Sequence, residues 1–460
     1  MRTIRIVLFA LVWFSCAWFG SWERNDNQAT RMYAAIGLVE EGDARIDRYA
    51  ALTIDKAVFG DHYYLDKAPG MTLMALPAVA VADRWTGERA RDLLPGSPDF
   101  DRYLRLRTRL AAASGPAVLT AIAAVLLFDL TLGIAGSAAA ALFAALGYAL
   151  GTPVWGWSTT LFGHAVVADL YLIALWGSAR AMRGRIGGAL LAGLSLGWAI
   201  VAEHQAVLAA IPIALWALAG VWRHPRRSGL IAAGLAGGVV ALLPLAAYNL
   251  IAFGTPFRIG YAGVVGWEGM HQGLFGLGMP RPDALRSITI GWRHGLLWVA
   301  PVLALAPFGL WSWARAPRTR GLALTAAATA LVVLLVNAAY VYWEGGNTTG
   351  PRFAIPAVAP LALGLAAIWM QGRRAERIGM AALLAVSIAI NAAIASAEIF
   401  AAPGPAFPVW QAVIAGPFAA GFLRTMPSEW FGWSAWAGFA WWAALALPAM
   451  GWLAWRARRA

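Results

Sequence analysis

Long apolar segments alternate with short polar breaks along most of the chain. Runs such as 4–19, 110–130 and 322–341 approach the roughly 20 apolar residues that an α-helix needs to cross a bilayer. Because lipid offers no hydrogen bonds to the backbone, such runs are expected to cross as helices. The pattern therefore predicts an all-α polytopic membrane protein.

Arginines set the predicted topology, because the cytoplasmic loops of membrane proteins are enriched in arginine and lysine. They gather in six breaks, at residues 2–5, 180–185, 223–227, 315–320, 373–377 and 456–459. If all six breaks face the cytoplasm, an even number of spans must separate each neighbouring pair. Beyond residue 180 the apolar runs follow this rule in pairs. The arginines thus predict that both termini are cytoplasmic.

One apolar run between the first two arginine breaks must then fail to cross. Five runs lie there, at 4–20, 68–82, 110–130, 136–151 and 161–179. The run 68–82 is the shortest and contains two prolines and a glycine, so we expect a helix lying in the outer interface of the membrane. About twelve transmembrane helices remain.

Acidic residues mark the largest polar region, since 14 of the 23 Asp and Glu residues lie between Glu23 and Asp101. We expect this region to be periplasmic. The chain is then a single transmembrane domain, 1–460, with the following parts: a first periplasmic loop with interfacial helices at 21–109, core spans at 110–252, a periplasmic loop at 253–293, spans at 294–398, a periplasmic segment at 399–433, and the last span with a cytoplasmic tail at 434–460.

Composition agrees with a membrane protein: 60% of the residues are hydrophobic and 13% are charged, against about 25% in soluble domains. The net charge of +13 is explained by the arginines of the cytoplasmic breaks, so nucleic-acid binding is not expected. The single cysteine, Cys16, excludes an internal disulfide.

Asp26 is the first candidate for chemistry, because it lies a few residues beyond the first apolar run. Residues 30–39 have helical character, so Asp26 or Asn27 could cap a helix. The alternative is that Asp26 is a general base at the membrane surface, a role that suits a carboxylate within reach of a proton donor.

The stretch "HYYLDKAPGM" contains Lys67, one of only two lysines in the chain. An ammonium on a short tether can bind a phosphate group. The alternative is a lysine that extends from an interfacial helix to the lipid headgroups. Because arginine is the usual cation of this chain, we favour phosphate binding by Lys67. In the same stretch Tyr63, Tyr64 and Asp66 are candidates for contacts to an acceptor or a metal.

The order of these motifs resembles the GT-C superfamily of polyprenyl-phosphate-sugar-dependent glycosyltransferases. The resemblance lies in an acidic residue just after the first span, "R-x-Y" at Arg31 and Tyr33, "G-D" at 42–43, and "Y-Y-x-D-K-A-P-G" before an apolar helix. Within this superfamily, the order of motifs is similar to that of protein O-mannosyltransferases and of lipid A aminoarabinose transferases. The resemblance implies a GT-C-like fold and a loop helix along the membrane. Asn27, where relatives often have glutamate, departs from the pattern.

Four further ionisable residues are expected near the outer ends of spans: His164, Asp169, Glu203 and His204. Ionisable residues within or next to a span usually face a cavity or a partner. A satisfied role in helix packing is the alternative for His164 and Asp169, and a solvated turn is the alternative for Glu203 and His204. The resemblance implies that an acidic residue near 164–169 helps to bind donor phosphate, acceptor or metal. Asp26, His164, Glu203 and His204 could together bind a divalent metal such as Zn²⁺ or Mn²⁺, although their spacing forms no metal motif.

The stretch "WEGGNTTGPRF" joins two spans on the predicted outer side. Its glycines indicate a tight turn that delivers Arg352 to the start of a span, with Glu344 at the beginning of the turn. An arginine on this side departs from the general trend, and it suits a lipid-phosphate site. A salt bridge to lipid headgroups is the alternative. We rank Arg352 beside Lys67, with Arg31 as a third phosphate ligand.

These features predict an inverting membrane glycosyltransferase that moves a sugar from a polyprenyl phosphate to an acceptor hydroxyl. The enzyme would act on the periplasmic face of the bacterial inner membrane, and its acceptor would be a glycan, a glycolipid or a protein. A transporter or flippase of lipid-linked sugars is the alternative, but it predicts ionisable residues near the bilayer midplane and two pseudo-symmetric halves. A membrane acyltransferase, which would place a histidine base deeper in the membrane, is a third hypothesis.

Overall fold

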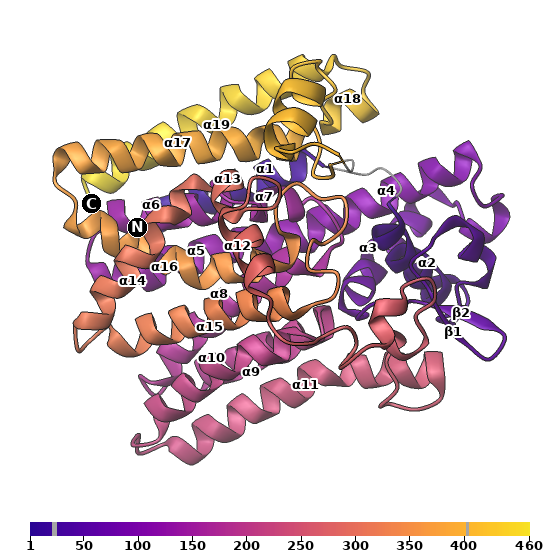
Figure 1. Cartoon of the computed structure of the whole chain (residues 1–460), viewed down its shortest axis with the longest axis horizontal. Coiled ribbons are helices and arrows are strands. Elements are labelled where there is room, and N and C mark those ends of the chain that lie inside the picture. The colour runs from indigo at the N-terminus through magenta and orange to yellow at the C-terminus, as the bar shows by residue number, and fades with distance from the viewer. Residues whose placement is uncertain (21–24, 402–403) are drawn as a thin grey trace.

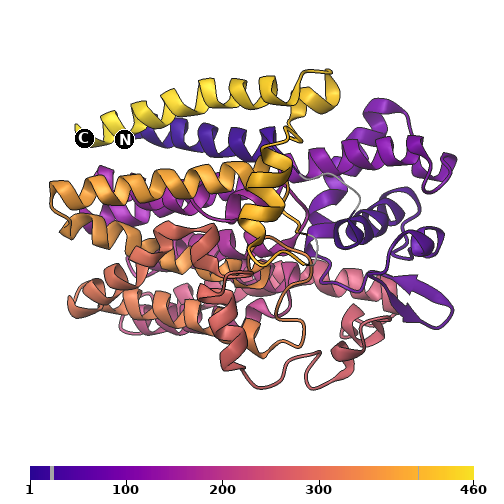
Figure 2. The same cartoon turned by 45° about the horizontal axis from the view of Figure 1, so that its top comes forward.

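The computed structural model describes residues 1–20, 25–401 and 404–460. The predicted start of the first loop at residue 21 lies outside them. Long helices lie side by side in a bundle, and a smaller layer built by residues 26–114 lies at one end (Figure 1). We call this part the N-terminal layer. Both termini lie at the opposite end of the bundle (Figure 2), as an even number of crossings requires.

Each of the twelve predicted spans overlaps a helix of the bundle. Six helical stretches in the described part of the chain are long and apolar enough to cross a membrane, and others are shorter. The predicted all-α polytopic architecture is confirmed. The bundle helices are α1 (Arg2–Trp18), α5 (Pro116–Ala135), α6 (Ala138–Ala149), α8 (Gly163–Ala181), α9 (Ile186–Ala202), α10 (Ala206–Val221), α11 (Arg227–Phe253), α14 (Ala306–Arg315), α15 (Arg320–Ala339), α16 (Val358–Gln371), α17 (Arg374–Ser396) and α19 (Ala435–Arg458).

The N-terminal layer contains helices and one small hairpin. Its elements are α2 (Asp26–Glu40), η1 (Asp47–Leu52), β1 (Ala57–Phe59), β2 (His62–Tyr64), α3 (Gly70–Thr86), η2 (Ala90–Asp92) and α4 (Pro98–Ser114). The two strands are antiparallel, with Ala57 opposite Tyr64. The run 68–82 forms most of α3, which packs between α2 and α4 within this layer. Its position relative to the lipid stays a prediction.

The last helix of the layer runs almost directly into the first span that follows. Ser97 caps α4 by accepting a hydrogen bond from the Phe100 N–H, and only Gly115 separates α4 from α5. The two helices form a stretch of 38 residues, Pro98–Ala135. The predicted boundary between the first loop and the next span, at residues 109 and 110, therefore falls inside α4. The helix begins earlier than the apolar run because its start is set by the Ser97 cap.

Short elements connect the spans. They are α7 (Val154–Trp157), η3 (Gly260–Gly263), η4 (Glu268–His271), α12 (Pro282–Ile290), α13 (Leu296–Val299), η5 (Pro301–Leu305), η6 (Arg352–Ala357), η7 (Val409–Phe418) and α18 (Met426–Trp430). The segment after α11 is fixed at two places: the Val265 N–H donates to the Lys56 carbonyl (3.2 Å), and the Val341 N–H donates to the Gly276 carbonyl (2.8 Å). These bonds attach the second loop both to the N-terminal layer and to the end of α15.

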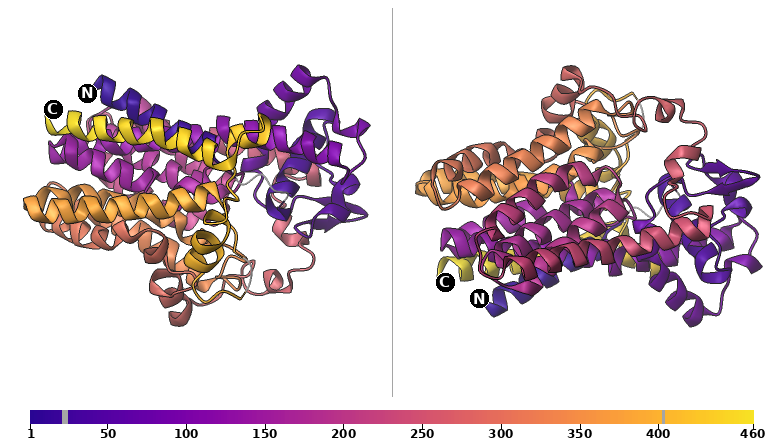
Figure 3. Two further views of the ribbon diagram at one scale, coloured as in Figure 1. Left: turned by 90° about the horizontal axis from the view of Figure 1, so that it is seen from above. Right: turned by 90° about the horizontal axis from the view of Figure 1, so that it is seen from below.

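Glycines allow α9 and α11 to lie very close together (Figure 3). A methyl group on Gly193 would lie 1.9 Å from the Gly234 carbonyl oxygen, and one on Gly237 would lie 2.3 Å from the Leu190 carbonyl oxygen. Small residues permit such backbone contact between membrane helices, where dispersion forces replace the hydrophobic effect. This pair packs closely because its sequence leaves out side chains at the contact.

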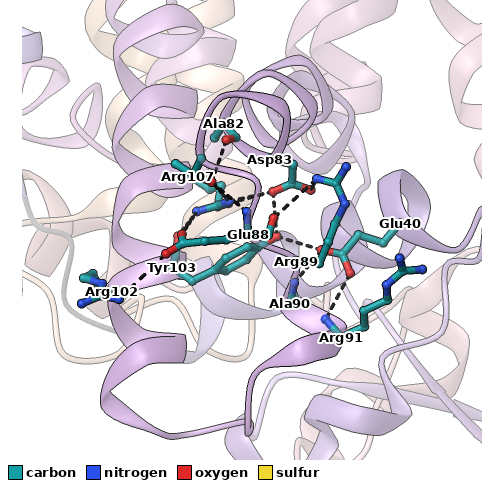
Figure 4. A network of polar contacts seen from close by, with 11 residues as sticks. Glu40, Ala82, Asp83, Glu88, Arg89, Ala90, Arg91, Arg102, Tyr103 and Arg107 are labelled. Atoms are coloured by element: carbon teal, nitrogen blue, oxygen red, sulfur yellow. Dashed lines mark hydrogen bonds and ion pairs between the residues drawn. The ribbon is translucent and has the colours of Figure 1, made fainter.

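Buried charges hold the N-terminal layer together (Figure 4). Asp83 of α3 accepts hydrogen bonds from the Tyr103 hydroxyl (3.0 Å) and from Arg107 Nε (2.9 Å), both on α4. The Tyr103 hydroxyl also lies 3.0 Å from Glu40 at the end of α2. Arg107 is fully buried and makes a further ion pair with Glu88 at 3.3 Å. This network joins all three helices of the layer.

Replacing Arg107 with methionine is expected to destabilise the layer by about 3 kcal/mol or more, because Asp83 would lose a buried ion-pair partner. Arg102 is the matched control on the same helix, since it is exposed and its ion pairs with Asp99 and Glu88 measure 3.4 and 3.8 Å. Arg102→Met should change stability by at most about 1 kcal/mol. Unfolding in detergent measures both variants, and equal stabilities would contradict the role of Arg107.

Candidate functional site

A cavity of about 1080 Å³ lies between the N-terminal layer and the adjoining ends of the bundle helices. Asp26 and Lys67 line it from the layer, and Arg352 lines it from the start of η6. The predicted base and two of the predicted phosphate ligands, which are far apart in the sequence, thus line one cavity. Their roles stay predictions. Of the other predicted candidates, the cavity wall also contains Arg31, Asp66, His164, Glu203 and Glu344.

Asp26 is the first residue of α2 and does not cap it. The cap is Asn25, whose side-chain oxygen accepts a hydrogen bond from the Asn27 N–H at 3.1 Å. The expectation that Asp26 or Asn27 is the cap is therefore wrong by one or two residues. Asp26 is half-buried, and its carboxylate accepts a hydrogen bond from the Ile54 N–H at 3.2 Å. It is thus held at the cavity without an ion-pair partner among the described residues.

Lys67 lies between two carboxylates. Its Nζ lies 2.5 Å from Asp66 Oδ2 and 3.4 Å from Asp55 Oδ2. Burial raises the pKa of Asp66, while the Lys67 charge opposes this shift and the Asp55 charge adds to it. The charge of Lys67 is therefore largely balanced within the protein. Asp55 was not a sequence candidate, although its place directly before Lys56 repeats the pairing of Asp66 with Lys67.

Arg352 follows the predicted tight turn. Gly345 and Gly350 have φ values of +74° and +80°, which side chains rarely adopt, and a methyl group on Gly345 would lie 2.9 Å from Arg352 Cγ. The Arg352 guanidinium makes no hydrogen bond or ion pair with any residue that the structure describes. Its Cζ lies 5.4 Å from the ring centre of Phe162 and 4.9 Å from that of Phe353. Arg352 is thus a cation of the cavity whose direct contacts are with aromatic rings and not with carboxylates.

Several positively charged or titratable side chains act on Glu203. Arg31, which is almost fully buried in α2, donates to the Asn27 carbonyl (3.1 Å) and approaches Glu203 Oε1 at 3.4 Å. His164 Nδ1 lies 3.9 Å from the same oxygen. Burial raises the pKa of Glu203, and the charges of Arg31, Arg352 and Lys67 oppose this shift. Several cations of the cavity therefore act on one carboxylate, and Arg31 is in direct contact with it.

Gly163 is needed for this arrangement and was missed in the sequence. A methyl group on Gly163 would lie 2.6 Å from Glu203 Oε1 and 2.9 Å from the Ala202 carbonyl oxygen. Only glycine lets the start of α8 approach Glu203 this closely. The signal in the sequence was a glycine directly before His164 at the beginning of an apolar run.

Four predicted candidates do not line the cavity: Tyr63, Tyr64, Asp169 and His204. Asp169 is buried between helices, where it accepts hydrogen bonds from Tyr148 (2.6 Å) and Thr120 (2.8 Å). His204 packs edge-on against Tyr261, and burial lowers its pKa to about 4. Tyr64 packs against Phe253, and Tyr63 lies under Lys56. A role of these four side chains in binding an acceptor or a metal stays a prediction.

The four residues considered as metal ligands do not converge. His164 and Glu203 approach each other, but Asp26 bonds to the Ile54 backbone and His204 packs on an aromatic ring. Within residues 1–20, 25–401 and 404–460, no three His, Cys, Asp or Glu side chains come together as metal ligands would. The arrangement gives no support to a metal held by this set.

No family model matches the chain, and no curated protein matches its sequence. Among solved structures, the chain is similar to ArnT from Cupriavidus metallidurans bound to undecaprenyl phosphate, with a TM-score of 0.50. The two chains are 14% identical, and the similarity covers 98% of this chain and 75% of that one. At this identity the similarity shows the fold, and it supports the predicted GT-C-like architecture.

Proposed function

We propose that this protein is a membrane glycosyltransferase that transfers a sugar from a polyprenyl-phosphate donor to an acceptor hydroxyl. In this proposal the reaction takes place at the periplasmic face of the bacterial inner membrane, and both termini are cytoplasmic. The observation that carries the proposal is the cavity in which the carboxylate of Asp26 and the guanidinium of Arg352 lie without ion-pair partners among the described residues. The bound undecaprenyl phosphate of the similar structure supports a lipid phosphate as the ligand.

The reaction needs a base on one side of the sugar and a cation on the other. Asp26 would take the proton from the acceptor hydroxyl as its oxygen forms a bond to the anomeric carbon. The bond between that carbon and the phosphate oxygen breaks, and polyprenyl phosphate leaves with the electron pair. A single displacement inverts the anomeric configuration. Because phosphate is a weak base, the leaving group requires no general acid.

Arg352 is the cation best placed to stabilise the departing phosphate, because its guanidinium makes no direct ion pair with a described residue. Fixed cations aimed at a developing charge lower the barrier most effectively in a site from which water is excluded. Lys67 and Arg31 are already paired with Asp55, Asp66 and Glu203. We propose that these two cations orient the phosphate and that Arg352 stabilises its developing charge.

Charge placement favours transfer over transport of the lipid. The Asp, Glu, His, Lys and Arg residues of the cavity wall belong to the N-terminal layer, to helix ends that face it, and to the loops beside it. Asp169, which lies deeper in α8, is bonded to neighbouring helices. A flippase would need polar groups along a path through the bundle.

Release of polyprenyl phosphate tests the proposal. The purified protein, in liposomes with a bacterial envelope extract as acceptor source, is given a panel of labelled undecaprenyl-phosphate sugars. The expected result is transfer of label to the acceptor together with an equal amount of undecaprenyl phosphate. Movement of intact labelled lipid between leaflets without its consumption would contradict the proposal and support the flippase.

A further inference from the structure

Phe162 lies against two cations at once. The guanidinium Cζ of Arg31 is 5.6 Å from the centre of its ring, and that of Arg352 is 5.4 Å from the same centre. The two arginines come from α2 and η6, which are more than 300 residues apart in the chain. One aromatic ring thus contacts both Arg31 of the N-terminal layer and Arg352 of the bundle.

The Phe162 ring can stabilise two cations that repel each other. Two guanidinium groups at one cavity repel each other, and Arg352 has no carboxylate partner among the described residues. The face of an aromatic ring attracts cations within about 6 Å of its centre. Arg31 has polar partners in Asn27 and Glu203, so the ring is of greatest importance for Arg352. Phe353 supplies a second ring for Arg352, whereas Phe162 is shared by both arginines.

Packing fixes Phe162 behind the cavity wall. Its side chain is 1% exposed, and its ring meets Trp157 at 4.9 Å and Phe400 at 5.9 Å. The residue directly precedes α8 and Gly163, so its backbone is held by the same close approach that places Glu203. Phe162 does not line the cavity, whereas both arginines do. It therefore touches the cations and not the space where a ligand would lie.

We propose that Phe162 is a positioning residue that holds Arg31 and Arg352 at the geometry needed to bind a lipid phosphate. This inference rests on the proposed function, because it assigns the ligand of the two arginines. The ring supplies no proton and no direct ligand contact. Its effect is confined to the part of the binding energy that comes from the phosphate group.

Comparing the binding of undecaprenyl phosphate with that of undecaprenol isolates the contribution of the phosphate group to the binding energy. The two lipids share the same chain, so the ratio of their affinities measures the phosphate contribution. Phe162→Leu keeps an apolar side chain but removes the aromatic face, and we expect it to lower this ratio about tenfold. Phe162→Tyr keeps the face and should restore most of the ratio. Binding is measured in detergent by tryptophan fluorescence.

Two controls separate positioning from a general loss of structure. Phe128→Leu changes another fully buried phenylalanine, in α5 and away from the cavity, and should leave the ratio unchanged. In a protein carrying Arg31→Met and Arg352→Met, adding Phe162→Leu should have no further effect on the ratio. A further loss in that background would overturn the proposal, because the ring would then act without the arginines.

The outcomes also distinguish this inference from the proposed function. If Phe162→Leu keeps the wild-type ratio, or weakens both lipids equally, the positioning role is wrong while the phosphate site stands. If the wild-type protein itself does not prefer undecaprenyl phosphate over undecaprenol, the phosphate site fails, and the inference fails with it.

Discussion

Replacing Asp26 with asparagine is expected to lower the rate of sugar transfer by about 10²–10⁴-fold, the usual contribution of a general base. Asparagine has nearly the same shape and can still accept the hydrogen bond from the Ile54 N–H. It cannot take a proton from the acceptor hydroxyl. The chemical step is therefore lost while the helix start and the cavity wall remain. Release of undecaprenyl phosphate from the labelled donor measures the rate.

Asp61→Asn is the matched control for this change. Asp61 belongs to the same polar loop, but it is exposed beside the β-hairpin turn and does not line the cavity. Its replacement should leave the rate unchanged. Affinity for undecaprenyl phosphate should not weaken in either variant. Full activity in Asp26→Asn would remove the base assignment and would direct attention to the other carboxylates of the cavity wall.

Replacing Arg352 with methionine is expected to lower kcat by about 10²–10³-fold, which is the cost of losing one charge-stabilising group in an active site. Because Arg352 lies against the rings of Phe162 and Phe353 and makes no ion pair with a described residue, its removal breaks no buried ion pair. Stability should therefore change little, and the loss should appear in the chemical step. Steady-state rates with saturating donor measure kcat, and thermal unfolding in detergent measures stability.

Arg352→Lys tests the geometry of the charge. Lysine keeps the positive charge but lacks the planar group that lies against aromatic rings and binds two phosphate oxygens, so it should restore only part of the rate. Arg286→Met is the control, because Arg286 is exposed on α12 and does not line the cavity. A wild-type kcat in Arg352→Met would contradict stabilisation of the leaving group by this residue.

The architecture could be predicted because it depends on sums over many residues. Hydropathy over about 20 positions and the distribution of arginines do not change when one side chain is misplaced. Asp26 and Lys67 could be selected because their motifs resemble those of a known superfamily, and Arg352 could be selected because it follows a glycine-rich turn. The structure places all three at one cavity.

Single positions were less predictable, because one residue turns a helix by about 100°. Asp169 lies five residues after His164 on α8, but it faces Tyr148 and Thr120 in the bundle rather than the cavity. The cap of α2 was misplaced for a different reason: Asn25, Asp26 and Asn27 are adjacent, and all three are good capping types. The role of Phe162 depends on two arginines from other parts of the chain, and no local pattern could indicate it.

The junction of a single residue between α4 and α5 has a consequence for engineering this protein. Inserting or deleting one residue within either helix would rotate everything on one side of the change by about 100° and shift it by about 1.5 Å. A chimaera that exchanges residues 26–114 with those of a relative must therefore preserve the helical phase at the junction, not only the length of the loop. Junctions that break this phase should fail to assemble even when every exchanged residue is compatible with its new neighbours.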